Sequence, residues 1–132
     1  MNKENKLVPG LPSGFEDRWS NKLLLKKKLV KAIEKNFIKF GAEALETPSF
    51  EISENIGSFL AEDEANPMSD VFSFQDGEKS ITLRYDLSSP LARFVAQNNQ
   101  ELPSIFKRYQ IQNVFRNEKA GNGRYREFMQ AD

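Results

Sequence analysis

The residues best suited to chemistry lie near the end of the chain, in a segment rich in arginine and lysine. Residues 107–126 hold six basic side chains and one acidic side chain, Glu118. Arg116 falls near the end of one predicted strand, and Arg124 and Arg126 begin the next. Two arginines on facing strands can grip different parts of one polyphosphate, because each planar guanidinium donates to two oxygens and keeps its charge. A basic hairpin is also typical of a solvated or nucleic-acid-binding surface, so this pattern alone leaves those alternatives open.

A second cluster occupies residues 84–90, which read Arg-Tyr-Asp-Leu-Ser-Ser-Pro. A carboxylate at Asp86, followed by the hydroxyl of Ser88 at the mouth of a predicted helix, can hold an ammonium group. The same residue types cap helix N-termini, and Ser88 or Ser89 could do so here, while Pro90 suits the first helical turn. The cluster therefore indicates either an ammonium site or a capped helix.

The composition excludes several kinds of chemistry. The 132 residues contain no cysteine and no histidine, which excludes disulfides, thiol nucleophiles, zinc fingers and histidine bases. Catalysis would depend on carboxylates, arginine, lysine, hydroxyls, backbone amides or a bound ion. The sequence gives no reason to assign a metal ligand.

Length and polarity are typical of one soluble globular domain. The chain is 39% apolar and 29% charged, which is too apolar for a disordered protein. No apolar run reaches the roughly 20 residues of a membrane span, and the N-terminus lacks the apolar core of a secretory signal. We therefore expect a cytoplasmic protein that does not enter a membrane.

The net charge of zero hides a segregation along the chain. Residues 1–40 carry a net charge of +6, residues 41–76 carry −9 with no basic residue, and residues 77–132 carry +3. A wholly basic nucleic-acid-binding protein is therefore disfavoured, while a local anion site remains possible.

The clearest predicted element is an amphipathic helix of about twenty residues that begins at Ser20. Apolar residues recur every three or four positions, and the stripe comprises Leu25, Leu29, Ile33, Phe37 and Phe40. Lysines fill the other face, which is typical of a solvated helix surface, although such a face could also bind nucleic acid. Gly41 stands where a C-terminal cap belongs.

After an irregular lead-in, the other predicted elements are short strands and one more helix. The predicted strands are residues 42–47, 71–74, 80–83, 105–115 and 125–131. A turn at Asp76–Gly77 joins two of them as a hairpin, and a helix covers about 88–98. Residues 50–60 show no clean period. Loops at 61–70 and 119–123 are expected to be the most mobile segments.

Both chemical clusters have neighbours that resemble the N-terminal catalytic region of the histidyl-tRNA synthetases, a class II aminoacyl-tRNA synthetase family. Residues 11–17 resemble the family's Pro-Arg-Gly-x-x-Asp opening, and residues 40–51 resemble motif 1. Leu-Arg-Tyr-Asp-Leu-Ser at 83–88 resembles the histidine-binding Leu-Arg-Pro-Glu-x-Thr segment. Residues 115–130 match motif 2 in residue type and spacing. The four segments occur in the family's order over nearly the whole chain.

The resemblance implies an α+β fold, with a class II synthetase-like antiparallel sheet flanked by helices, present here as a partial domain. Residues 1–132 would be the N-terminal portion of the catalytic domain, with motif 1 at about 28–51 and motif 2 at about 105–132. Motif 3 and the anticodon-binding domain are absent from these residues. The chain stops at Asp132 directly after the last predicted strand, so we expect a truncated chain that is inactive alone.

The resemblance also assigns candidate site residues. The ATP-binding residues would be Arg116, Glu118, Arg124 and Phe128, and the histidine-binding residues would be Asp86, Ser88, Arg116 and Gln130. The family pattern makes Arg116 the catalytic residue, because it bridges the α-phosphate and the substrate carboxylate. Glu118 would accept a hydrogen bond from the adenine amino group, Arg124 would hold the outer phosphates, and Phe128 would face the adenine ring.

Three positions depart from the family's usual residues. Asp86 stands where the family has Glu, and Ser88 stands where it has Thr; both keep the chemistry with a different reach. Met129 occupies a position that is often His in the family.

The implied activity is that of a histidine–tRNA ligase, which activates histidine with ATP and transfers it to tRNA(His). ATP and L-histidine would be the small substrates, Mg²⁺ would accompany the ATP, and the protein would be a homodimer joined through motif 1. One alternative is the non-catalytic regulatory subunit of ATP phosphoribosyltransferase, which shares the fold and much of the motifs. An alternative of another class is a dimerisation or RNA-binding module that uses the lysine-rich helix and the basic hairpin without ATP.

Overall fold

The computed structural model describes residues 7–56 and 70–132. In chain order its elements are α1 (Ser20–Lys39), β1 (Glu43–Ala44), β2 (Phe50–Ile52), α2 (Ser53–Ile56), β3 (Ser73–Asp76), β4 (Lys79–Leu83), α3 (Ser88–Asn98), β5 (Arg108–Tyr109), β6 (Ile111–Phe115) and β7 (Glu127–Ala131). The loop predicted at 61–70 lies outside the described residues apart from Asp70.

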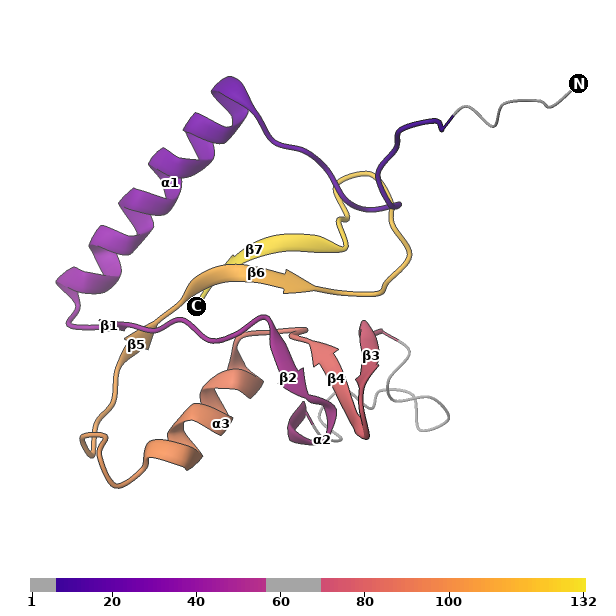
Figure 1. Ribbon diagram of the computed structural model, residues 1–132. Helices are drawn as coiled ribbons and strands as arrows, with labels where there is room; N and C mark the ends of the chain where they lie inside the picture. Colours follow the sequence, from indigo (N-terminus) through magenta and orange to yellow (C-terminus); the bar gives the residue numbers. More distant parts are fainter. Residues whose placement is uncertain (1–6, 57–69) are drawn as a thin grey trace, which may run out of the picture.

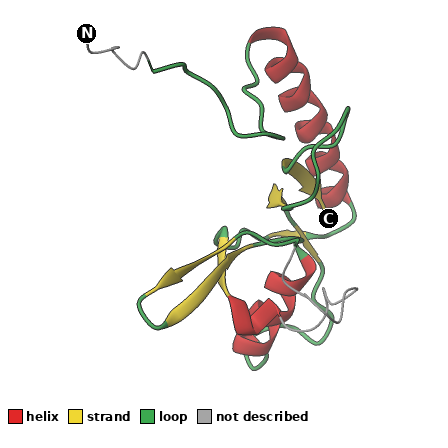
Figure 2. Cartoon of the chain, turned by 90° about the vertical axis from the view of Figure 1, so that its right-hand side faces the viewer, coloured by secondary structure: helices red, strands yellow, loops and turns green. Residues whose placement is uncertain are grey.

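The elements are arranged around the β6–β7 hairpin (Figure 1). Helix α1 lies on one side of this hairpin, and the β2–β4–β3 sheet with α2 and α3 lies on the other. Figure 2, from a second direction, also shows α1 and the three-stranded sheet at opposite ends of the molecule. The prediction of an α+β fold with mainly antiparallel sheets is confirmed.

Helix α1 is confirmed at Ser20–Lys39, and Gly41 follows its C-cap at a φ of 79°, which suits glycine. The predicted buried stripe is only partly correct. Ile33 and Phe37 are half-buried, whereas three members of the stripe are exposed: Leu25, Leu29 and Phe40. The helix faces the hairpin across a cavity of about 200 Å³. This cavity is lined on the helix by Lys26, Leu29, Val30 and Ile33, and on the hairpin by Ile111, Met129 and Ala131.

The described strands form three small sheets, where the resemblance implies one antiparallel sheet. β1 pairs with β5 in parallel, β4 is the antiparallel centre of the β2–β4–β3 sheet, and β6 pairs with β7 antiparallel. The predicted hairpin around Asp76–Gly77 is confirmed as β3 and β4. A backbone hydrogen bond from Phe115 N–H to the Arg84 carbonyl, at 2.9 Å, joins the end of β6 to the segment that follows β4.

Several predicted strands differ in extent. The strand predicted at 42–47 is two residues long, and β2 and α2 lie in the segment where no period was visible. The long strand predicted at 105–115 changes partner at Gln110. Residues before Gln110 pair with β1, whereas Gln110 exchanges backbone hydrogen bonds with Asp132 at 2.9 and 3.0 Å and β6 continues along β7. A change of partner within one extended segment leaves no mark on the side-chain period.

A buried polar network ties these sheets together around Thr47. The Arg84 guanidinium donates to the Thr47 carbonyl at 2.8 Å and to the Asn113 carbonyl at 2.6 Å. Gln110 donates to the Thr47 hydroxyl at 2.8 Å, and the Thr47 N–H donates to Gln112 Oε1 at 3.0 Å. Arg84 is 3% exposed, so this side chain links three segments and does not reach solvent.

The two faces of β2 have different surroundings. Glu51 is buried and accepts two hydrogen bonds from Arg93 of α3, at 2.8 and 3.0 Å. On the opposite face, Phe50 and Ile52 are 55% and 38% exposed, and Phe50 contacts Phe74 of β3 edge-on at a ring separation of 5.3 Å. Phe74 is itself 43% exposed. One face of this sheet is therefore covered by α3, and the other presents apolar side chains.

Within the residues that the structure describes, no helix is both long and apolar enough to cross a membrane.

Candidate functional site

The β6–β7 hairpin forms one wall of a cavity of about 400 Å³. Its lining comprises Arg116, Glu118, Gly123, Arg124, Tyr125 and Phe128. Val114 and Phe128 are register partners, so they share the face of the hairpin opposite to the one that packs on α1. All four candidate ATP-binding residues therefore meet at a single cavity.

Arg116 is held by two aromatic rings at this cavity. Its guanidinium carbon lies 4.4 Å from the centre of the Tyr85 ring and 5.2 Å from that of Phe128. Its Nε donates to the Tyr85 carbonyl at 3.3 Å. Contacts between a cation and aromatic faces stabilise this position of the guanidinium without neutralising its charge. Arg116 is thus placed as a preorganised positive group that retains donors for a ligand.

Glu118 accepts hydrogen bonds from two directions. Tyr85 Oη donates to Glu118 Oε1 at 2.9 Å, and the Arg124 guanidinium pairs with Oε2, with its Nε at 2.9 Å. The Arg124 hydrogen bond, followed by that of Tyr85, lowers the pKa of the Glu118 carboxyl from its ordinary value of 4.5. Burial and the bond to Glu118 raise the pKa of the Tyr85 phenol. Two candidate ATP ligands are therefore paired with each other.

Arg126, the third arginine of the predicted grip, has a different role. Its guanidinium lies 4.6 Å from the ring centre of Phe72 and donates to the Ser13 carbonyl at 3.1 Å. A Cβ on Gly14 would come within 2.6 Å of the Arg126 side chain, so only glycine permits this close approach. Arg126 holds the N-terminal lead-in against the hairpin and is absent from the cavity lining.

The second cluster lines a separate cavity of about 260 Å³, with Asp86, Ser88, Ser89 and Ala92 on its wall. The prediction that Ser88 or Ser89 caps α3 is wrong. Leu87 is the N-cap residue and makes no side-chain cap, because its side chain is apolar, and both serines lie inside the helix. Asp86 Oδ1 instead accepts from the Ser89 N–H at 3.1 Å. Asp86 therefore caps the helix through one carboxylate oxygen.

Gln130 lies two residues beyond Phe128 on β7, opposite Gln112. Its Oε1 is buried and has no hydrogen-bond partner among the described residues. A buried acceptor without a donor is costly, and an ammonium group is a donor that would satisfy it. Met129, which alternates with these residues, lies against α1 on the opposite face. The departure at Met129 therefore does not alter the cavity wall.

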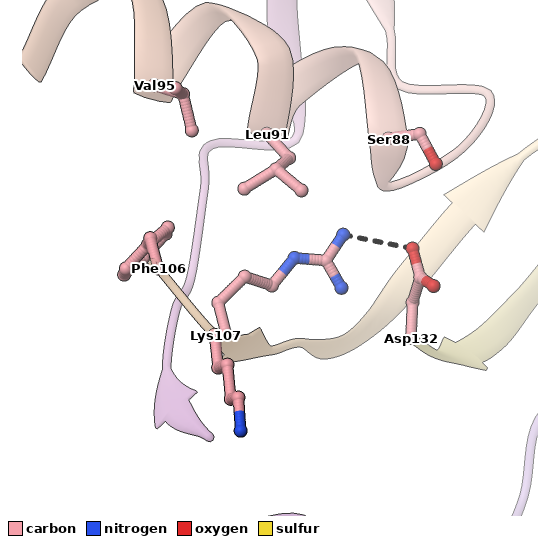
Figure 3. A pocket seen from close by; sticks show the side chains of 7 residues that line it. Ser88, Leu91, Val95, Phe106, Lys107 and Asp132 are labelled. Carbon is pink, nitrogen blue, oxygen red and sulfur yellow. Dashed lines mark hydrogen bonds and ion pairs between the residues drawn. The ribbon is translucent and has the colours of Figure 1, made fainter. Parts of the chain in front are cut away.

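A larger cavity of about 590 Å³ lies between α3 and the start of β5. Figure 3 shows Leu91 and Val95 of α3 facing Phe106 across it, with Ser88 and Asp132 at one end. Arg108 also lines this cavity and pairs with Asp132 at 2.9 Å. Of the candidate site residues, only Ser88 contributes to this wall.

The described parts of the chain bring together no group of three or more histidine, cysteine, aspartate or glutamate side chains suited to a metal ion. The donors at the 400 Å³ cavity are mainly cationic, which suits an anionic ligand and not a metal cation.

Three residues of the site were not among the candidate site residues. Gly123 and Tyr125 line the cavity, and Tyr85 contacts both Arg116 and Glu118. Tyr85 stands within the motif of the second cluster, but its partners lie more than thirty residues further along the chain. The backbone hydrogen bond between Phe115 and Arg84 brings the two segments side by side and so makes the contact possible.

The pairing of Glu118 with Arg124 predicts a pH dependence. Because the folded pKa of Glu118 is lowered, the pair is intact above pH 4.5 and is lost as the pH falls through that lowered pKa. Arg124→Gln should raise the Glu118 pKa towards its ordinary value. Carbon-13 NMR titration of the glutamate carboxyls measures both effects. Glu16, whose pKa is lowered mainly by a hydrogen bond from Lys22, should be unaffected by Arg124→Gln. An unchanged Glu118 titration in that variant would contradict the pairing.

Comparison with known proteins finds one family over most of the chain. The model of the class II tRNA synthetase core domain matches residues 16–132. The chain is 80% identical over all 132 residues to the histidine–tRNA ligase of Pelagibacter ubique, and 46% identical over 131 residues to that of Bartonella quintana. It covers 28% and 26% of these two proteins, so it spans about a quarter of the length of the curated relatives it matches.

Solved structures show the same likeness. The histidyl-tRNA synthetase of Nostoc superposes with a TM-score of 0.75 at 27% identity, over 92% of this chain and 27% of that one. A protein of Bacillus halodurans, described as an ATP phosphoribosyltransferase regulatory subunit/histidyl-tRNA synthetase, superposes with a TM-score of 0.76 at 24% identity. That alignment covers 99% of this chain and 32% of that one. At this identity the second likeness concerns the fold alone.

Proposed function

The chain belongs to the family of class II tRNA synthetase core domains, and on this basis we propose that it is the N-terminal part of the catalytic domain of a histidine–tRNA ligase. The observation that carries the proposal is the meeting of Arg116, Glu118, Arg124 and Phe128 at one cavity. The identity of 80% to a histidine–tRNA ligase over the whole chain supports the choice of amino acid. Motif 1 would lie at about 28–51 and motif 2 at about 105–132, with motif 3 and the anticodon-binding domain outside these residues.

The proposed reaction has two steps. A carboxylate oxygen of histidine attacks the α-phosphorus of ATP, and the bond to the bridging oxygen of pyrophosphate breaks. The products are histidyl-adenylate and pyrophosphate. The acyl group then passes to the 3′-terminal adenosine of tRNA(His), and AMP leaves. Transfer at phosphorus requires mainly positioning and neutralisation of charge, so a site without histidine or cysteine is adequate.

Arg116 would hold the two reacting anions together. The carboxylate and the α-phosphate repel each other, and the guanidinium fork can donate to both at once. Its place between Tyr85 and Phe128 means that little reorientation is needed when charge develops in the transition state. Arg124, 64% exposed at its side chain, would leave Glu118 and bind the outer phosphates. Glu118 would then accept from the adenine amino group beside the Phe128 ring.

The histidine substrate would lie between the two cavities. The Arg116 guanidinium donates to the carbonyl of Tyr85, the residue before Asp86. The carboxylate of one histidine molecule could therefore contact Arg116 while its ammonium group contacts Asp86. Asp86 would bind the ammonium group through Oδ2, because its Oδ1 already accepts the hydrogen bond that caps α3. Ser88 lies on the same cavity wall. The buried, unpartnered Oε1 of Gln130 supports its proposed bond to the ammonium group.

Mg²⁺ would enter bound to the phosphates of ATP. The absence of a carboxylate cluster among the described residues means that these residues offer no separate metal site, and no step is assigned to the ion here. The reaction further implies tRNA(His) as partner and the cytoplasm as the place of action.

We also propose that the protein is a homodimer joined through residues 40–60. The exposed apolar side chains of Phe50, Ile52 and Phe74 on one face of the β2–β4–β3 sheet support this, because a face of this kind is stabilised by a partner surface. We expect sedimentation of the full-length protein at micromolar concentration to give a dimer, and Phe50→Lys to shift it towards monomer. A monomeric wild-type protein would contradict the proposal.

The two alternative functions have weaker support. The regulatory-subunit alternative is supported by a shared fold with one solved structure, to which this chain is 24% identical. By contrast, this chain is up to 80% identical to histidine–tRNA ligases. An RNA-binding module would require a cationic surface without a built nucleotide cavity, and the pairing of Arg116 with two aromatic rings inside the cavity favours a small anionic ligand.

Histidine-dependent exchange between ATP and pyrophosphate tests the proposal. The full-length protein that contains this chain should catalyse the exchange with histidine and not with the other amino acids. It should also charge tRNA(His). Exchange that is absent, or that does not depend on histidine, would overturn the proposed function.

A further inference from the structure

Tyr85 contacts both charged residues that the proposed reaction depends on. Its ring lies under the Arg116 guanidinium at 4.4 Å, its carbonyl accepts from Arg116 Nε at 3.3 Å, and its hydroxyl donates to Glu118 Oε1 at 2.9 Å. One side chain therefore fixes a cation and an anion on neighbouring positions of the cavity wall.

We propose that Tyr85 is a positioning residue of the adenylation site, whose ring holds Arg116 for catalysis and whose hydroxyl orients Glu118 for adenine. This inference rests on the proposed function and adds to it. The hydroxyl occupies Oε1 of the Glu118 carboxylate, whereas Oε2 is paired with Arg124. When Arg124 moves to the phosphates, Oε2 becomes the free acceptor, and the carboxylate cannot turn because Oε1 remains bound to Tyr85.

The two parts of the Tyr85 side chain act on different kinetic constants. The contact between Glu118 and adenine exists in the bound ground state, so loss of the hydroxyl should weaken ATP binding. The contact of Arg116 with the reacting groups is strongest in the transition state, so loss of the ring should lower kcat. A residue with a merely structural role would not separate the two constants in this way.

The test uses Tyr85→Phe and Tyr85→Leu in the full-length protein. Tyr85→Phe should raise both the KM and the Kd for ATP about tenfold, as expected for one hydrogen bond to a charged group, with kcat changed less than twofold. Tyr85→Leu should show the same loss of affinity and, in addition, a kcat lowered about tenfold by the missing cation–π contact. In a Glu118→Ala background, Tyr85→Phe should add less than a twofold change, because the acceptor of its hydrogen bond is already removed.

Tyr109→Phe is the matched control. The Tyr109 hydroxyl donates to the Glu34 carboxylate at 3.0 Å, so the same kind of hydrogen bond is removed outside the cavity. This variant should keep the wild-type KM for ATP and the wild-type kcat. Equal effects of Tyr85→Phe and Tyr109→Phe on the KM for ATP would overturn the inference, as would a full additional tenfold loss in the Glu118→Ala background.

The inference and the proposed function fail by different results. If the full-length protein catalyses histidine-dependent exchange and the Tyr85 variants behave like the wild type, the proposed role of Tyr85 is wrong and the proposed function stands. ATP binding that follows the expected variant pattern, in a protein without exchange, supports the role of Tyr85 and overturns the function. A wild-type protein that does not bind ATP overturns both.

Discussion

Arg116→Ala in the full-length protein is expected to lower histidine-dependent pyrophosphate exchange by about a hundredfold to a thousandfold. This corresponds to about 3–4 kcal/mol, the cost of losing one preorganised charge-stabilising donor. The structure supplies the preorganisation, because the guanidinium is already held by the Tyr85 and Phe128 rings and by the Tyr85 carbonyl. Most of the loss should fall on kcat, with smaller changes in the KM for ATP and for histidine.

Arg116→Lys should restore little of this activity. An ammonium group is a point charge that cannot donate to a phosphate and a carboxylate in one plane, and it packs less well between two rings. Lys79→Ala is a suitable control, because it removes one positive charge at the exposed start of β4, outside the cavity lining. Unimpaired exchange by Arg116→Ala, with the Lys79→Ala variant also active, would remove Arg116 from the mechanism.

The candidate ATP-binding residues at the 400 Å³ cavity could be identified from the sequence because they lie close together in it. Arg116, Glu118 and Arg124 lie in the connection between β6 and β7, and Phe128 lies on β7, so a single hairpin brings them together. Their types also match a known pattern. What the sequence could not supply is the pairing of Arg124 with Glu118.

The roles of Arg84 and Tyr85 depend on contacts between distant segments, which periodicity does not reveal. Arg84 stood in a chemically suggestive cluster, yet it is buried against the carbonyls of Thr47 and Asn113. Arg126 is similar, since its guanidinium stacks on Phe72 and does not face the cavity. A charged residue in a basic segment has the same sequence signature whether it binds a ligand or a backbone carbonyl.

The fold was predictable where local patterns dominate. Helix α1 and the β3–β4 hairpin follow directly from apolar spacing and a turn at Gly77. The face that α1 turns towards the hairpin was only partly predictable. Leu29 and Ile33 of the predicted stripe line the cavity between the two elements, but so do Lys26 and Val30, which lie outside that stripe. The short β2 escaped detection because Glu51, at its centre, is a charged residue buried by pairing with Arg93.

The largest expected effect on stability concerns Arg84. Arg84→Met keeps the length of the side chain and removes both of these hydrogen bonds. The buried Asn113 carbonyl then loses its guanidinium donor, and the Thr47 carbonyl keeps only the longer hydrogen bond from Gln112, at 3.2 Å. Each lost hydrogen bond from a charged donor costs about 1.5–3 kcal/mol, so we expect a loss of at least about 3 kcal/mol in the local stability of β6. Arg84→Lys should recover only part of this, because an ammonium group does not reproduce the guanidinium geometry that reaches both carbonyls.

Native-state hydrogen exchange of the full-length protein measures this loss, because it reports local opening without requiring two-state unfolding of several domains. The amide of Phe115 donates to the Arg84 carbonyl and should exchange about a hundredfold faster in Arg84→Met, by the same estimate of about 3 kcal/mol. Lys22→Met is the control, since the Lys22 side chain is 64% exposed where it pairs with Glu16 of the N-terminal lead-in, and exposed pairs contribute under about 1 kcal/mol. If the Phe115 amide retains wild-type protection in Arg84→Met, the buried guanidinium does not hold the sheets together, and the tie between β6 and the Tyr85 segment must come from their backbone hydrogen bonds alone.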